Sequence, residues 1–79
     1  MSRHDLILPD LGIDDLPITV SLWLVRRGAR VAAGDPLIEI LAGSVTVDLP
    51  APVGGVLVEK LVEEGETSQV GQRLGVIEP

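Results

Sequence analysis

Cysteine, phenylalanine and tyrosine are absent from the 79 residues, and Trp23 is the only aromatic side chain. Without cysteine the chain can form neither a disulfide nor a reactive thiol, as is usual in a reducing compartment. Without a series of aromatic residues it lacks the stacking surfaces that bind single-stranded nucleic acid. The hydrophobic core must therefore consist mainly of valine, leucine and isoleucine.

Basic residues are also scarce, with six lysines and arginines against twelve aspartates and glutamates and a formal net charge of −6. An acidic surface repels phosphate backbones and anionic lipids, so we expect neither nucleic acid nor a membrane as a partner. A basic protein surface remains a possible partner. No apolar run reaches the roughly 18 residues of a membrane span, and MSRHDLILPD lacks the features of a secretory signal. We therefore expect a cytoplasmic protein.

Glycine and proline separate short segments that are rich in valine, isoleucine and leucine. Short segments of this kind predict strands, so we expect a single all-β domain over residues 1–79. The run Val45–Leu49 alternates, and we expect Thr46 and Asp48 to face water while the other side chains are buried. The expected strands are Arg3–Leu8, Ile18–Arg27, Pro36–Leu41, Val45–Leu49, Gly55–Leu61 and Arg73–Ile77, with short pieces at Arg30–Val31 and Ser68–Gln69.

An internal repeat divides the chain into two similar halves. The segment WLVRRGARVAAGDPLIEI, residues 23–40, aligns without a gap on KLVEEGETSQVGQRLGVI, residues 60–77, at a spacing of 37 residues. Both copies contain Leu-Val, two charged residues, Gly, five residues, Gly, two residues and Leu. Two copies are too few for a solenoid. They predict two similar half-domains that pack about an approximate two-fold axis.

The stretch EILAGSVTVDLPAP, residues 39–52, is typical of a β-hairpin with Gly43 and Ser44 at its tip. Glycine at the first position of a two-residue loop favours a type II′ turn, because glycine tolerates a positive φ. Ser44 has no base beside it in the sequence, and a hydroxyl needs a base to become a good nucleophile. The tip is therefore not expected to be catalytic.

Taken together, two long segments resemble the lipoyl domain, a member of the biotinyl/lipoyl carrier fold. They are ILPDLGIDDLPITVSLWLVRRGARVAAGDPLIEI and VDLPAPVGGVLVEKLVEEGETSQVGQRLGVIE, and they span nearly the whole chain. The resemblance implies a flattened β-barrel, or barrel-sandwich hybrid, of two small antiparallel sheets with quasi-two-fold symmetry. It also implies the swinging-arm carrier domain of the acyltransferase component of a 2-oxo acid dehydrogenase complex.

The chain departs from this family at the hairpin tip. The family's attachment turn is Glu-Thr-Asp-Lys-Ala, in which the lysine receives lipoate through an amide, whereas residues 41–45 are Leu-Ala-Gly-Ser-Val. Ser44 therefore occupies the lipoyl-lysine position, with Gly43 before it at the hairpin tip. The Met-Lys-Met of a biotin carrier is absent as well. We predict that the tip is unmodified, that no cofactor is bound, and that Lys60, the only lysine, is an ordinary surface residue.

The resemblance also implies a partner-binding loop beside the hairpin. We predict a protein-binding surface formed by Leu11, Gly12, Ile13, Asp14, Asp15 and Leu16. The implied partners are the decarboxylase component of a 2-oxo acid dehydrogenase complex and the lipoate-attaching enzyme, and we expect the isolated domain to be a monomer. Asp10, Asp14 and Asp15 lack the alternating ligands of a calcium loop, so no metal site is predicted. A solvated acidic loop is the alternative interpretation.

Three hypotheses for the function follow. The first is a lipoyl-domain-like module without its own active site, which acts as a docking or structural unit. The second is a functional acyl carrier that is modified elsewhere or through an altered tip, with Lys60 as the candidate site. The third is a structural module from a larger protein, such as the hybrid domain of an export adaptor. Trp23 is predicted to pack in the core, and Arg26, Arg27 and Arg30 to lie in a solvated turn.

Overall fold

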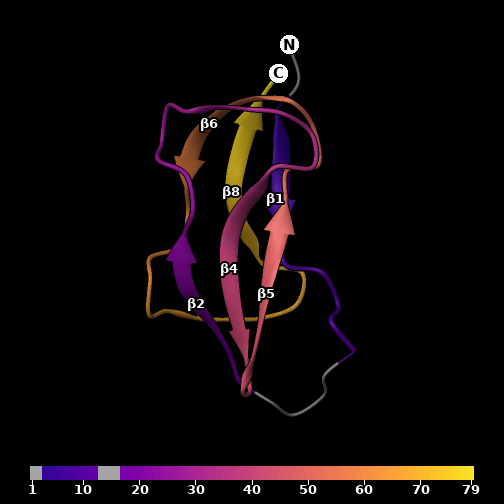
Figure 1. Cartoon of the computed structure of the whole chain (residues 1–79), viewed down its shortest axis with the longest axis vertical. Coiled ribbons are helices and arrows are strands. Elements are labelled where there is room, and N and C mark those ends of the chain that lie inside the picture. Colours follow the sequence, from indigo (N-terminus) through magenta and orange to yellow (C-terminus); the bar gives the residue numbers. More distant parts are fainter. Residues whose placement is uncertain (1–2, 13–16) are drawn as a thin grey trace.

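The computed structural model describes residues 3–12 and 17–79, which contain eight strands and no helix (Figure 1). Accordingly, no helix that could cross a membrane occurs among these residues. The strands are β1 (His4–Ile7), β2 (Ile18–Trp23), β3 (Arg30–Val31), β4 (Pro36–Ala42), β5 (Val45–Pro50), β6 (Gly55–Lys60), β7 (Thr67–Ser68) and β8 (Arg73–Glu78). The predicted all-β class is confirmed, and each predicted strand has a counterpart.

Most predicted strands differ from the observed ones by a single residue at an end, but the end of one strand and one burial pattern were predicted wrongly. The strand expected over Ile18–Arg27 ends at Trp23, because the chain then bends towards the turn in which the Ala29 N–H donates to the Arg26 carbonyl. The piece expected at Ser68–Gln69 lies one residue earlier, as β7. In β5, Val45 was predicted to be buried but is 55% exposed. It belongs to the last residue pair of the ladder, directly beside the tip and at the end of the molecule.

The strands form two antiparallel four-stranded sheets, in the orders β1-β8-β6-β3 and β5-β4-β2-β7. They pack face to face in a molecule of 37 × 19 × 19 Å, with the β4–β5 tip at one end and the start of β1 and the end of β8 at the other (Figure 1). The fully buried side chains between the sheets are aliphatic, as the composition requires: Leu8, Val20, Leu37, Ile38, Ile40, Leu57, Leu74 and Ile77.

The repeat of the sequence reappears as a repeat of the structure. A shift of 37 residues places β2, β3 and β4 on β6, β7 and β8, and the β4–β5 pair corresponds to the β8–β1 pair. The Gly28 N–H donates to the Leu57 carbonyl at 2.7 Å, and its counterpart Gly65 donates to Val20 at 2.7 Å. Gly28 and Gly65 have φ values of +92° and +93°. The quasi-two-fold symmetry predicted from the sequence is therefore confirmed, and it exchanges the two sheets.

The two halves differ in how they fill one equivalent position. In β3, Val31 is buried and lies opposite Gly55, whereas in β7 the counterpart Ser68 is buried and lies opposite Ile18. In both pairs a larger residue lies opposite a smaller one. The larger residue is on the short strand β3 in the first pair, but on the long strand β2 in the second. The Ser68 hydroxyl is buried and has no hydrogen-bond partner within the described residues.

Candidate functional site

The β4–β5 hairpin presents Gly43 and Ser44 at one end of the molecule (Figure 1). The last pair of the ladder is Ala42 with Val45, so the loop contains two residues as predicted. Gly43 has a φ of +63°, in the range that a primed hairpin turn requires at its first position. The Gly43 N–H also donates to the Pro17 carbonyl at 3.3 Å. The tip is therefore fixed by the ladder on one side and by the chain entering β2 on the other.

Ser44 is exposed at this tip. His4, the only histidine, is in β1 and pairs with Ile77 at the opposite end of the molecule. The nearest carboxylates along the hairpin belong to the opposed pair Glu39 and Asp48, three ladder steps away. Three steps along a strand are about 10 Å, which is beyond hydrogen-bond reach. The tip is thus an exposed hydroxyl with no general base on its hairpin.

The predicted partner-binding loop is only partly described. Leu11 is half-buried and packs against the core, and Gly12 donates its N–H to the Asp10 carboxylate at 2.8 Å. Ile13, Asp14, Asp15 and Leu16 lie outside the described residues, so the surface predicted for them stays a prediction. The residue that follows them, Pro17, accepts the hydrogen bond from the tip. Pro17, the first described residue after this segment, therefore lies beside the hairpin.

Lys60 lies at the end of β6 rather than on a turn, and it is half-buried. Its ammonium group is 5.1 Å from the centre of the Trp23 ring, which is a cation–π contact. This geometry favours a residue that packs against the protein surface. It does not favour the extended, freely rotating lysine that an attachment enzyme must reach.

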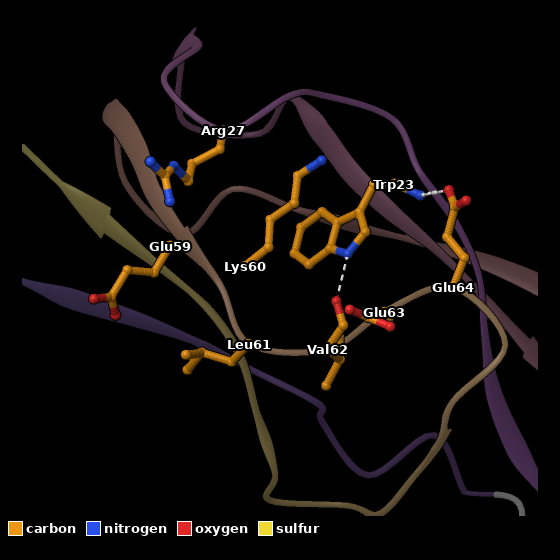
Figure 2. A pocket seen from close by; sticks show the side chains of 8 residues that line it. All are labelled: Trp23, Arg27, Glu59, Lys60, Leu61, Val62, Glu63 and Glu64. Atoms are coloured by element: carbon orange, nitrogen blue, oxygen red, sulfur yellow. Dashed lines mark hydrogen bonds between the residues drawn. The ribbon is translucent and has the colours of Figure 1, made fainter.

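An open groove of about 710 Å³ surrounds this contact (Figure 2). The Trp23 ring crosses from β2 to the other sheet, where it lies against Gly75, and its indole N–H donates to the Val62 carbonyl at 3.0 Å. The Trp23 backbone N–H donates to the Glu64 carboxylate at 2.9 Å. The predicted packing role of Trp23 is confirmed, but the ring also forms the floor of a surface hollow. The groove is lined by Trp23, Arg27, Glu59, Lys60, Leu61, Val62, Glu63 and Glu64.

Among the groove residues, only Lys60 had a predicted function, as the candidate modification site of the second hypothesis. One signal in the sequence could have located the groove, because the repeat aligns Trp23 with Lys60 and Arg27 with Glu64. Both aligned pairs line the same hollow. Within the described residues, no group of three or more histidine, cysteine, aspartate or glutamate side chains is placed to hold a metal ion.

Comparison with known proteins identifies the family and supports the fold described above. A model of the biotin/lipoyl family, described as "Biotin-requiring enzyme", matches residues 4–77. A solved structure described as a single-chain, multi-domain long-chain acyl-CoA carboxylase superimposes with a TM-score of 0.76 at 27% identity, over 94% of this chain and 7% of that one. The barrel-sandwich fold predicted from the sequence is therefore confirmed.

Similar curated proteins are acyltransferase components. The succinyltransferase component of the 2-oxoglutarate dehydrogenase complex of Bartonella vinsonii subsp. berkhoffii is 39% identical over 71 residues, which are 90% of this chain and 17% of that protein. The lipoamide acyltransferase component of the branched-chain alpha-keto acid dehydrogenase complex of Bacillus subtilis is 35% identical over 78 residues, 99% and 18% of the two chains. The chain thus spans less than a fifth of the length of these two relatives.

Proposed function

Because the chain belongs to the biotin/lipoyl family, we propose that it is a lipoyl-domain-like module of a 2-oxo acid dehydrogenase acyltransferase component that carries no lipoyl group at its tip. The module acts by docking onto protein partners. The domain has the fold of a carrier domain, and we assign no catalytic step to it. The observation that carries this proposal is Ser44 at the tip of an otherwise intact hairpin.

The residues at the tip do not fit a lipoyl group. Lipoate is held through an amide, which requires a primary amine, and the described part of the hairpin offers a serine hydroxyl instead. Lys60 supplies the only side-chain amine, and it contacts the Trp23 ring. We therefore derive no acyl-transfer step for this chain.

The docking surface that we propose consists of the tip and the neighbouring loop, Leu11–Leu16. Its support is the hydrogen bond from the Gly43 N–H to the carbonyl of Pro17, the residue that directly follows this segment in the sequence. Leu41 and Val45 flank the tip with 36% and 55% of their surface exposed, which adds apolar contact area for a partner. The partners proposed are the decarboxylase component of the complex and the lipoate-attaching enzyme.

The test is the intact mass of the purified chain after incubation with a lipoate-attaching enzyme, lipoate and ATP. The chain and its Ser44→Lys variant are compared, each also with Lys60→Arg to remove the only native lysine. We expect no mass gain for the chain and one lipoyl group on the Ser44→Lys variant, with or without Lys60.

Either of two results would contradict the proposal. If the chain itself gains a lipoyl group that Lys60→Arg abolishes, it is a working carrier modified at Lys60. If the Ser44→Lys variant folds but stays unmodified, the remaining surface is not recognised by the attaching enzyme, and this docking partner is wrong.

A further inference from the structure

The outer face of the sheet β5-β4-β2-β7 carries carboxylates but no basic side chain. Its four strands contain no lysine, arginine or histidine. The cross-strand pairs place Leu22, Glu39 and Asp48 in one row across the sheet, and Leu41 and Thr46 in the next row. These side chains point away from the core, because the residues that alternate with them in β4 are fully buried. The five residues are here called the acidic face.

Two like charges lie directly opposite each other on the acidic face. The pair Ala42–Val45 closes the two-residue loop and exchanges main-chain hydrogen bonds, so the pair Glu39–Asp48, three steps along, belongs to the non-hydrogen-bonded kind. Side chains are closest in such pairs, and like charges placed there destabilise a sheet. The Ser21 hydroxyl donates to Glu39 at 3.0 Å, but no ion pair among the described residues reaches either carboxylate.

The equivalent face of the other sheet has its charges paired within the molecule. The repeat places Glu59 and Glu78 where the acidic face has its two leucines, and both carboxylates lie near the Arg3 guanidinium, at 3.8 and 3.2 Å. Asp5 is the counterpart of the aspartate in β5, and it is 3.6 Å from Arg73. The two faces therefore have the same backbone plan, but only one of them leaves its carboxylates without a cation.

Two exposed leucines border the unpaired carboxylates. Leu22 and Leu41 have 45% and 36% of their surfaces exposed. Leu22 lies opposite Glu39 in the ladder of β2 and β4, and Leu41 follows Glu39 two positions along β4. Protein interfaces combine apolar contact of this kind with arginine, which is enriched there, whereas lysine is depleted. The acidic face thus offers apolar contact and negative charge side by side.

We propose that the acidic face binds a segment of a partner protein that presents an arginine between apolar side chains. The guanidinium lies over the pair Glu39–Asp48, because its planar set of donors reaches two neighbouring carboxylates, which a compact ammonium group does less well. The apolar side chains of the segment cover Leu22 and Leu41. A second copy of the chain does not fit, because it would present the same uncompensated carboxylates, and like charges disfavour such a pairing.

The experiment titrates the 15N-labelled chain with three probes and follows its amide signals by NMR. The first probe is the blocked peptide Val-Leu-Arg-Leu-Val, the second has glutamate in place of the arginine, and the third is N-acetylarginine amide alone. The same titrations are repeated with Asp48→Lys. Glu63→Lys is the matched control, since it makes the same change of net charge on an exposed residue in the turn after β6. Fluorescence of the only tryptophan shows that each variant is folded.

We expect the chain to bind the arginine peptide with a dissociation constant on the order of 1 mM, as suits a contact of few residues. The glutamate peptide should bind about fivefold more weakly, because exposed ion pairs contribute modestly. The signals that shift should be those of the acidic face. Asp48→Lys should abolish the preference and raise the melting temperature, since opposite charges then face each other across the ladder. Glu63→Lys should keep the preference.

Four results would overturn the proposal. They are equal binding of the two peptides, a preference that Glu63→Lys abolishes as well, N-acetylarginine amide that binds as tightly as the peptide, and a lower melting temperature for Asp48→Lys. The second would indicate an effect of net charge alone, and the third a site for an isolated cation. Binding at the acidic face does not require an unmodified Ser44, so its failure leaves the proposed function untouched.

Discussion

Replacing Ser68 by alanine should stabilise the protein. The residue is 4% exposed, and its hydroxyl has no hydrogen-bond partner within the described residues. In the unfolded chain the same hydroxyl is bonded to water, so folding costs the desolvation of an unpaired polar group, about 1–3 kcal/mol. Alanine removes that cost and adds no volume. We expect the free energy of unfolding to rise by about 1 kcal/mol, after allowing for the packing that the lost oxygen provides.

Valine at the same position should be worse than alanine, although the counterpart Val31 is a valine. Val31 lies opposite Gly55, which leaves room for it, whereas Ser68 lies opposite Ile18. Valine has one more heavy atom than the native serine, and placing it against Ile18 overpacks the core, which costs typically about 1–3 kcal/mol. We therefore expect Ser68→Val to be less stable than Ser68→Ala by an amount in this range. Combining Ser68→Val with Ile18→Ala should cost less than the sum of the two single changes, as contacting residues couple.

Urea unfolding measured by tryptophan fluorescence tests both expectations. Trp23 is the only aromatic residue and packs against the core, so its emission reports on the folded state. A gain of 1 kcal/mol corresponds to about 4–8 °C in melting temperature for a domain of this size. The reasoning is refuted if Ser68→Ala lowers the stability by 1 kcal/mol or more, since the hydroxyl would then have a partner in the folded protein.

Three further substitutions test the packing and the symmetry. A Cβ at Gly75 would lie 2.9 Å from the Glu59 carbonyl oxygen and 3.2 Å from the Trp23 ring, so Gly75→Ala should cost about 1–3 kcal/mol and red-shift the fluorescence. Unchanged emission and stability would contradict this contact. Gly28→Ala and Gly65→Ala meet open space at φ values of +92° and +93°, so each should cost about 1–2 kcal/mol of backbone strain in urea unfolding. Costs that differ by more than about 1 kcal/mol would show that the two turns are not equivalent.

The repeat made much of the fold predictable. A spacing of 37 residues between equivalent leucines and glycines is enough to identify β6 as the counterpart of β2, and β8 as the counterpart of β4. The alternating run in β5 predicts that this segment is a strand of a sheet. Gly43 and Ser44 predict the two-residue tip because the turn needs a positive φ. These features follow from local backbone preferences, which a sequence carries directly.

The remaining features depend on contacts between distant residues. Leu24 and Val25 continue the apolar run of β2, so periodicity alone placed the strand end too late. The groove exists because the Trp23 ring crosses to Gly75 in the other sheet, and no local pattern contains that contact. The candidate tip was predictable, because Gly43 and Ser44 lie between two alternating apolar runs of the sequence.

The correspondence between the β4–β5 hairpin and the β8–β1 pair has a consequence for chain connectivity. His4 pairs with Ile77 just as Val47 pairs with Ile40, but only the hairpin has a covalent turn. Joining the end of β8 to the start of β1 through a short loop, and cutting between Gly43 and Ser44, would give a circular permutant with the same two sheets. The order of the strands along the chain is thus not what determines this architecture, because the barrel holds two equivalent places where a chain can begin and end.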